Sequence, residues 1–209
     1  MSLFTFISLS YCNYSYAPSS GAPAATTAES AQQAGASQGS LEITLDYTKQ
    51  SGSASNQFAI WIEDANHEYV KTLYATRYTA NGGYKVRPDS IYEWVEKSGL
   101  AGMSEAEVDA VSGATPGPGT QTYIWDLTDA GGTQVQDGGY FFLVEGTLRW
   151  KNRVLFTGYV EIGGEAASFE PEPSFTFEGA GGQPALDEDS PEANMLAAVT
   201  ARYTPGAAN

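Results

Sequence analysis

Apolar and polar residues alternate along most of the chain after residue 40, and this alternation is typical of β-strands. The clearest run is 41–48, where Leu41, Ile43, Leu45 and Tyr47 fall on one face. Comparable runs predict further strands at 58–63, 69–76, 122–127, 140–150, 153–162, 175–177 and 195–203. A helix is the alternative for the last run. The regular spacing predicts an all-β fold, an antiparallel sandwich of two sheets.

The alternation stops between residues 79 and 119, a segment too long for an ordinary sandwich connection. Apolar residues at helical spacing over 91–95, preceded by Pro-Asp-Ser and followed by Ser-Gly, predict a first short helix. Ser104 with Glu107 three residues later forms a capping box that predicts a second. We therefore expect a helical insertion at 79–119, packed against one edge of the sandwich.

Residues 125–140 follow the pattern W-D-x-x-D-x-x-G-x-x-V-x-x-G-x-Y, which predicts a β-hairpin between the strands 122–127 and 140–145. Trp125 is expected to face the opposite sheet, between Tyr123 and Leu127. Over about twenty residues the pattern resembles the immunoglobulin-like module of the flagellar hook-capping protein. The resemblance implies an immunoglobulin-like or fibronectin-like β-sandwich, and such a fold alone does not indicate a function.

Residues 109–115 read Asp-Ala-Val-Ser-Gly-Ala-Thr. They resemble D-x-x-S/T-G-A-T, the string at which FMN transferases of the thiamine-biosynthesis-lipoprotein type attach FMN to threonine through a phosphoester. The resemblance implies covalent FMN at Thr115, with Asp109, Ser112, Gly113 and Ala114 as the other site residues. Small neighbours leave the threonine hydroxyl unobstructed. The same residues, followed by Pro-Gly-Pro-Gly, also fit a plain turn-rich loop.

The net charge of −15, from 10 basic and 25 acidic residues, argues against nucleic-acid partners and against docking onto anionic lipid. Four of the ten basic residues nevertheless lie in or beside the insertion: Arg77, Lys85, Arg87 and Lys97. They fit either ordinary pairing with acids or a phosphate subsite. Arg77, Lys85 and Arg87 are the candidates to offset an FMN phosphodiester at Thr115.

The chain offers little catalytic or metal-binding chemistry. Cys12 and His67 are the single residues of their types, which excludes an intramolecular disulfide and a cysteine-based metal cluster. His67 is expected at the tip of a hairpin turn, exposed to solvent. Asp126, Asp129 and Asp137 fit turn capping better than calcium binding. We therefore expect no metal and no enzymatic activity.

The N-terminal region has the composition of an exported protein. Residues 1–17 contain an apolar run and fit a signal segment cleaved after Ala17, or alternatively a lipobox that ends at Cys12. Residues 18–40 are a low-complexity linker, so the sandwich domain is expected over 41–205. The expected location is periplasmic or extracellular, with membrane contact only through a partner or an N-terminal anchor.

Taken in order, the segments of the chain resemble a family of predicted periplasmic proteins, domain of unknown function 2271. The resemblance rests on Phe58–Asp64, Tyr69–Leu73, Arg77–Ala80, Arg87–Ser90, Trp94, Asp109–Pro116 and Trp125-Asp126. It implies an exported protein, often encoded near membrane flavin and haem reductase components, without an established activity. We expect an accessory or covalently flavinylated component with a protein partner in a membrane redox complex. The alternative is a structural or interaction module without cofactor.

Overall fold

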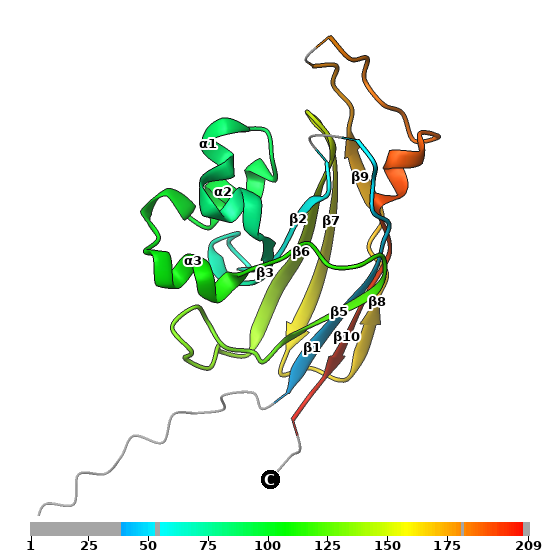
Figure 1. Cartoon of the computed structure of the whole chain (residues 1–209). Helices are drawn as coiled ribbons and strands as arrows, with labels where there is room; N and C mark the ends of the chain where they lie inside the picture. Colours follow the sequence, from blue (N-terminus) through cyan, green and yellow to red (C-terminus); the bar gives the residue numbers. More distant parts are fainter. Residues whose placement is uncertain (1–38, 53–54, 181, 207–209) are drawn as a thin grey trace, which may run out of the picture. The chain divides into compact units, whose positions relative to one another are not determined.

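Two β-sheets share one apolar core in the computed structural model (Figure 1), which describes residues 39–52, 55–180 and 182–206. The smaller sheet has the strand order β5-β1-β10-β8, and the larger has the order β4-β3-β2-β6-β7-β9. Every neighbouring pair is antiparallel except β3 and β4, which run parallel. The predicted all-β sandwich is confirmed, and the parallel pair is a departure from the purely antiparallel expectation.

The strands are β1 Ser40–Tyr47, β2 Gln57–Asp64, β3 Tyr69–Thr76, β4 Ser112–Gly113, β5 Gly119–Trp125, β6 Gly138–Arg149, β7 Asn152–Ile162, β8 Ala167–Phe169, β9 Pro173–Thr176 and β10 Leu196–Thr204. The helical segments are η1 Thr79–Gly83, α1 Tyr84–Val86, α2 Tyr92–Lys97, η2 Leu100–Gly102, α3 Glu105–Val111 and η3 Pro191–Met195. The predicted signal segment 1–17 and residues 18–38 of the predicted linker lie outside the described residues. Among the described residues, no helix is long and apolar enough to cross a membrane.

The core follows from the alternation along the strands. Leu41, Ile43, Leu45 and Tyr47 of β1 are all buried, as their spacing predicts. Trp125 is also buried, and its indole Nε1 donates a hydrogen bond to the carbonyl of Thr128 at 2.8 Å. That bond satisfies the polar atom of a ring that otherwise packs among apolar side chains.

The predicted hairpin between β5 and β6 is wrong. β5 pairs with β1 in the smaller sheet, whereas β6 pairs with β2 and β7 in the larger one. The chain therefore crosses from one sheet to the other between Trp125 and Gly138. The rings of Trp125 and Tyr140 meet across the core with centroids 5.3 Å apart. An alternating pattern shows which side chains face inward, but it does not show which strands pair.

The insertion covers a face of the larger sheet, so its predicted position against an edge is wrong (Figure 1). Ala59, Trp61 and Leu143 point away from the sandwich core and pack with Trp94 and Val108 of the helices in a second apolar cluster. β2 is consequently buried on both faces over nearly its whole length. Within the insertion only β4 adds to an edge, where it pairs with β3.

The helix α2 is fixed to the sheet through its N-terminal amides. None of its own side chains caps it, and Ile91 before it has a left-handed backbone with φ of 40°. Two side chains of β6 take over this role. The hydroxyl of Thr147 accepts the Ile91 amide at 2.9 Å, and the carboxylate of Glu145 accepts the Trp94 amide at 3.0 Å. A strand of the sandwich thereby holds the start of the helix that covers it.

Two smaller predictions also need correction. The turn between β6 and β7 consists of Trp150 and Lys151, one residue earlier than expected, because Asn152 already pairs with Arg149. The predicted loop at 163–172 contains β8, which pairs with β10. By contrast, the capping box of α3 is confirmed: the Ser104 hydroxyl accepts the Glu107 amide, and the Glu107 carboxylate accepts the Ser104 amide.

Candidate functional site

The segment 109–115 leads from α3 to the edge of the larger sheet. Asp109 lies on the last turn of α3, and the chain then extends into β4. There Ser112 and Gly113 align with Ala75 and Thr76 of β3. Gly113 is the last residue of β4 that pairs with β3, so this pairing fixes the start of the loop at Ala114.

The side chain of Tyr74 contacts the start of this loop at Gly113 and Ala114. Its hydroxyl donates a hydrogen bond to the carbonyl of Ala114 at 2.9 Å. A Cβ atom on Gly113 would lie 2.7 Å from Cε2 of the Tyr74 ring, closer than side-chain packing permits. Glycine is therefore required at position 113 by packing alone.

The hydroxyl of Tyr74 stays protonated, and so remains a donor, because burial raises its pKa well above the ordinary value. The ring belongs to an aromatic cluster, with centroids 4.9 Å from Phe58 and 5.1 Å from Tyr123. Burial raises the pKa of Tyr123 to about 12 as well. The start of the loop thus packs against Tyr74, which belongs to a group of uncharged rings from both sheets.

Thr115 is exposed, on a stretch without regular structure that precedes β5. Its hydroxyl is accessible, as the small neighbours predict. The Ser112 hydroxyl behaves differently: its oxygen is buried and makes no hydrogen bond to any described residue. A buried hydroxyl without a partner costs roughly 1–3 kcal/mol, so Ser112 is not explained by the packing of the described residues.

The basic residues of the insertion divide into two groups. Lys97 is engaged in the ordinary way, with its ammonium 2.8 Å from the His67 carbonyl and 3.8 Å from the Glu63 carboxylate. Arg77, Lys85 and Arg87 form no ion pair with any described residue, although the chain carries 25 acids. Ordinary pairing therefore accounts for Lys97 alone.

The three unpaired cations lie in different places. Arg77 directly follows Thr76, the residue that aligns with Gly113. Lys85 lines an open cleft of about 460 Å³ together with Asp109. Arg87 borders a separate hollow of about 90 Å³ with Trp150. The structure places Lys85 and Asp109 on one cleft and Arg87 at a separate hollow, and Arg77 directly follows the strand residue that aligns with Gly113.

A polar cluster around Glu63 was not foreseen from the sequence. The carboxylate of Glu63 is almost completely buried and accepts a hydrogen bond from Nε1 of Trp61 at 2.9 Å. Nδ1 of His67 lies 3.2 Å from the same carboxylate, and the imidazole stacks on Phe141. His67 sits at a turn tip as predicted, but it is a partly covered, oriented ring. Trp61, Glu63 and His67 are close together in the sequence, and the pairing of β2 with β6 adds Phe141 to them.

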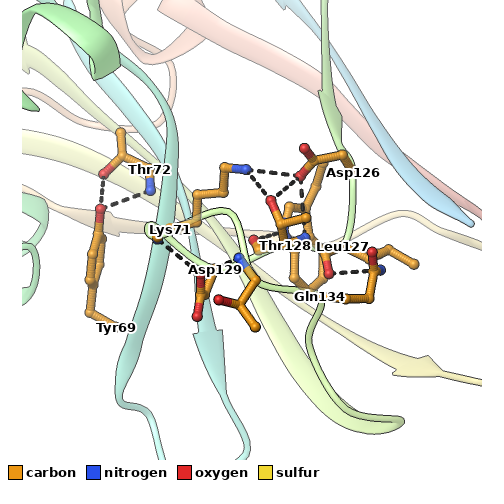
Figure 2. A network of polar contacts seen from close by, with 11 residues as sticks. Tyr69, Lys71, Thr72, Asp126, Leu127, Thr128, Asp129 and Gln134 are labelled. Carbon is orange, nitrogen blue, oxygen red and sulfur yellow. Dashed lines mark hydrogen bonds and ion pairs between the residues drawn. The ribbon is translucent and has the colours of Figure 1, made fainter. Parts of the chain in front are cut away.

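Asp126 and Asp129 of the 125–137 segment cap turns (Figure 2), whereas no hydrogen bond joins the Asp137 side chain to a described residue. Oδ1 of Asp126 accepts hydrogen bonds from Lys71 and from Thr128. Oδ1 of Asp129 accepts the amides of Gly131 and Thr133. Across the part of the chain that the structure describes, no group of three or more His, Cys, Asp or Glu side chains could hold a metal ion.

Comparison with known proteins gives one match. A family model described as "Predicted periplasmic protein (DUF2271)" matches residues 38–174, the region that contains the sandwich strands through β8, the helical insertion and the threonine loop. No curated protein and no solved structure matches the chain.

Proposed function

The chain belongs to the family of predicted periplasmic proteins called domain of unknown function 2271, and from this premise we propose that it is a non-enzymatic component of a membrane or periplasmic redox system. The location that the family description gives agrees with the export signal expected at residues 1–17. Within this proposal, Thr115 carries covalently bound FMN, and a protein partner in the redox complex exchanges electrons with it.

The observation that carries the proposal is the exposed Thr115, two residues after Gly113, whose strand partner Thr76 directly precedes the unpaired Arg77. Three of the four cations of the insertion form no ion pair with a described residue, although the chain has a net charge of −15. A phosphodiester on Thr115 would add a negative charge to this loop, and the planar guanidinium of Arg77 suits phosphate oxygens.

The attachment chemistry requires little of this chain. The Thr115 hydroxyl oxygen forms a bond to the phosphorus of the FMN half of a flavin dinucleotide. The pyrophosphate bond breaks, AMP leaves with the bonding electrons, and the hydroxyl proton passes to a base of the transferase. This protein must present an accessible hydroxyl on a backbone that the transferase can approach. Exposure of Ala114 and Thr115, above a loop start held by Tyr74, supports that role.

Ser112 also fits this role. Its buried hydroxyl lacks a partner among the described residues, so a movement of the loop that exposes it would let it bond a group that arrives with the modification. When bound, FMN supplies the redox chemistry, and the residues of this chain would hold its phosphate. The candidates are Arg77 through charge and Ser112 through a hydrogen bond.

Intact mass after co-expression with an FMN transferase tests the proposal. The wild type should gain the mass of one FMN and a protein-bound yellow colour. Thr115→Ala should gain neither, Thr115→Ser should recover part of the modification, and Asp109→Ala should gain little. Thr120→Ala is the matched control, because Thr120 is an exposed threonine at the start of β5, five residues further along the chain. Identical unmodified masses for the wild type and Thr115→Ala would refute the flavin proposal.

A second candidate function, an interaction module without cofactor, is favoured by one surface feature. The guanidinium of Arg87 lies 5.9 Å from the ring centroids of both Tyr78 and Trp150, and both rings are partly exposed. Trp150 occupies the hairpin tip with φ of 52°, a conformation better suited to Asn or Gly. Trp, Tyr and Arg are the residues that dominate protein interfaces. A wild type that stays unmodified beside an active transferase would favour this candidate.

A further inference from the structure

The outer edge of β10 is paired over only part of its length. On one side β10 pairs with β1 from Leu196 to Thr204, whereas on the other side it pairs with β8 only at residues 201–203. Among the described residues, no strand pairs with the outer edge of residues 196–200. Main-chain N–H and C=O groups on such an edge form a template for an additional strand.

A groove of about 440 Å³ runs along this unpaired stretch. It is lined by residues 196–200, by the segment 170–173, by Phe175 of β9 and by Phe156 of β7. Successive side chains of a strand point to opposite faces, so a groove that touches five residues in succession follows the edge of the strand. Phe156 and Val199 belong to the sandwich core, and the groove therefore reaches apolar surface.

The segment 170–173, which leads from β8 into β9, does not close this edge itself. Two of its four residues are prolines, which have no N–H to donate to a strand ladder. β10 also carries a bulge here, because Ala198 and Val199 together lie opposite Leu45 and Ala198 has a φ of 48°. A bulge interrupts regular pairing, so the free edge suits a short strand better than a long one.

The charge at the groove favours a basic occupant. Glu170 and Glu172 line it, both are exposed, and neither forms an ion pair with a described residue. No Lys or Arg lines the groove, and none occurs in the sequence from 154 to 200. The N-terminal residues 1–38 also contain no Lys or Arg, and a second copy would bring the same acids to the edge. The charges therefore select a basic segment of a different protein.

We propose that the groove binds a short extended segment of a protein partner, which adds a strand to β10 at residues 196–200. The main chain of the segment pairs with the free edge, while alternate apolar side chains pack on Phe156 and Phe175. Lys or Arg residues that flank the apolar ones face Glu170 and Glu172. This inference goes beyond the proposed flavinylation and does not depend on it.

The test uses the full chain and a fluorescein-labelled lysine peptide, Lys-Val-Thr-Val-Thr-Val-Lys, whose binding is followed by fluorescence anisotropy. A glutamate peptide, with Glu in place of both Lys, tests the charge. Two further lysine peptides, each N-methylated on one alternating set of amides, test the edge pairing, because alternate N–H groups of a strand point to opposite sides. Glu170→Gln/Glu172→Gln removes the groove charges. Glu188→Gln/Asp189→Asn is the matched control, since both residues are exposed and lie outside the groove.

The lysine peptide should bind saturably and the glutamate peptide should not. One N-methylated peptide should lose binding while the other keeps it. Glu170→Gln/Glu172→Gln should weaken the affinity roughly fivefold, because two exposed ion pairs are lost, whereas the control double variant should stay within about twofold of the wild type.

Three results would overturn the proposal: no saturable binding of the lysine peptide, equal binding of the two N-methylated peptides, or equal weakening by the two double variants. Sedimentation of the protein alone supplies a fourth. A dimer that the lysine peptide dissociates would assign the free edge to a second copy of this chain instead of a basic partner.

Discussion

Glu145 should make the protein less stable as the pH rises from 5 to 8.5. Its carboxylate is fully buried under α2, where it accepts the amide of Trp94 and lies 3.6 Å from the guanidinium of Arg153. Burial outweighs these favourable contacts and raises the pKa of Glu145 from 4.5 to about 7. The guanidinium is shared with Glu93, whose carboxylate lies 2.6 Å from it, so Arg153 only partly offsets the buried charge.

The sign and size follow from linkage. Between pH 4.5 and 7 the folded protein keeps a proton on Glu145 that the unfolded chain releases, so the free energy of unfolding falls as the pH rises. This contribution is fully present below pH 4.5 and is lost as the pH passes through about 7. At about 1.4 kcal/mol per pKa unit, the full loss is roughly 3 kcal/mol, of which about 2.5 kcal/mol falls between pH 5 and pH 8.5.

The perturbation is Glu145→Gln, which keeps an oxygen for the Trp94 amide and removes the titration. Urea unfolding, followed by the fluorescence of the buried tryptophans, gives the free energy of unfolding at each pH. The difference between wild type and variant cancels the other acids. It should shift by about 2.5 kcal/mol in favour of the variant from pH 5 to pH 8.5. Glu178→Gln, which removes an exposed carboxylate, is the control and should parallel the wild type. Parallel profiles for wild type and Glu145→Gln would refute the reasoning.

Three further substitutions test the packing. Trp125→Ala should cost roughly 3–5 kcal/mol in urea unfolding, because a fully buried ring is removed, and a loss under about 1 kcal/mol would contradict its placement. Gly113→Ala should cost roughly 1–3 kcal/mol through its clash with Tyr74, whereas Gly117→Ala, with open space at its Cβ, should not; equal melting temperatures for the two would count against the clash. Ser104→Ala should cost about 1 kcal/mol by removing the α3 cap, and an unchanged melting temperature would show that the cap is dispensable.

Local sequence patterns predict those structural features that depend only on residues close together in the sequence. The inward set of β1 and the capping box at Ser104 are both confirmed, because each depends on spacing within a few residues. The pairing of β5 with β1 joins segments about eighty positions apart, and no local signal indicates it. The same limit explains the misplaced insertion. Trp61 alternates like a solvent-facing residue, and its burial depends on Trp94 arriving from another part of the chain.

In the candidate site, too, the sequence predicts local features and misses those that depend on tertiary contacts. Exposure of Thr115 and the helix that ends before it could be read from small residues and a cap. The role of Tyr74 could not, because it depends on the parallel pairing of β4 with β3. Which cations remain unpaired also depends on tertiary packing. Arg77 and Lys85 look alike in sequence to Lys97, yet Lys97 alone finds a carboxylate.

The threonine loop can be explained by packing at one position and not at the others. Gly113 must be glycine because Tyr74 fills the space where a side chain would go. Ala114 contributes a carbonyl that any residue could offer, and Thr115 projects into solvent. Ser112 places an unsatisfied hydroxyl in a buried position, where alanine would avoid the cost. A loop selected only to connect α3 with β5 would need the glycine and none of its small polar neighbours. The proposed attachment of FMN at Thr115 would supply a reason for these residues that packing does not.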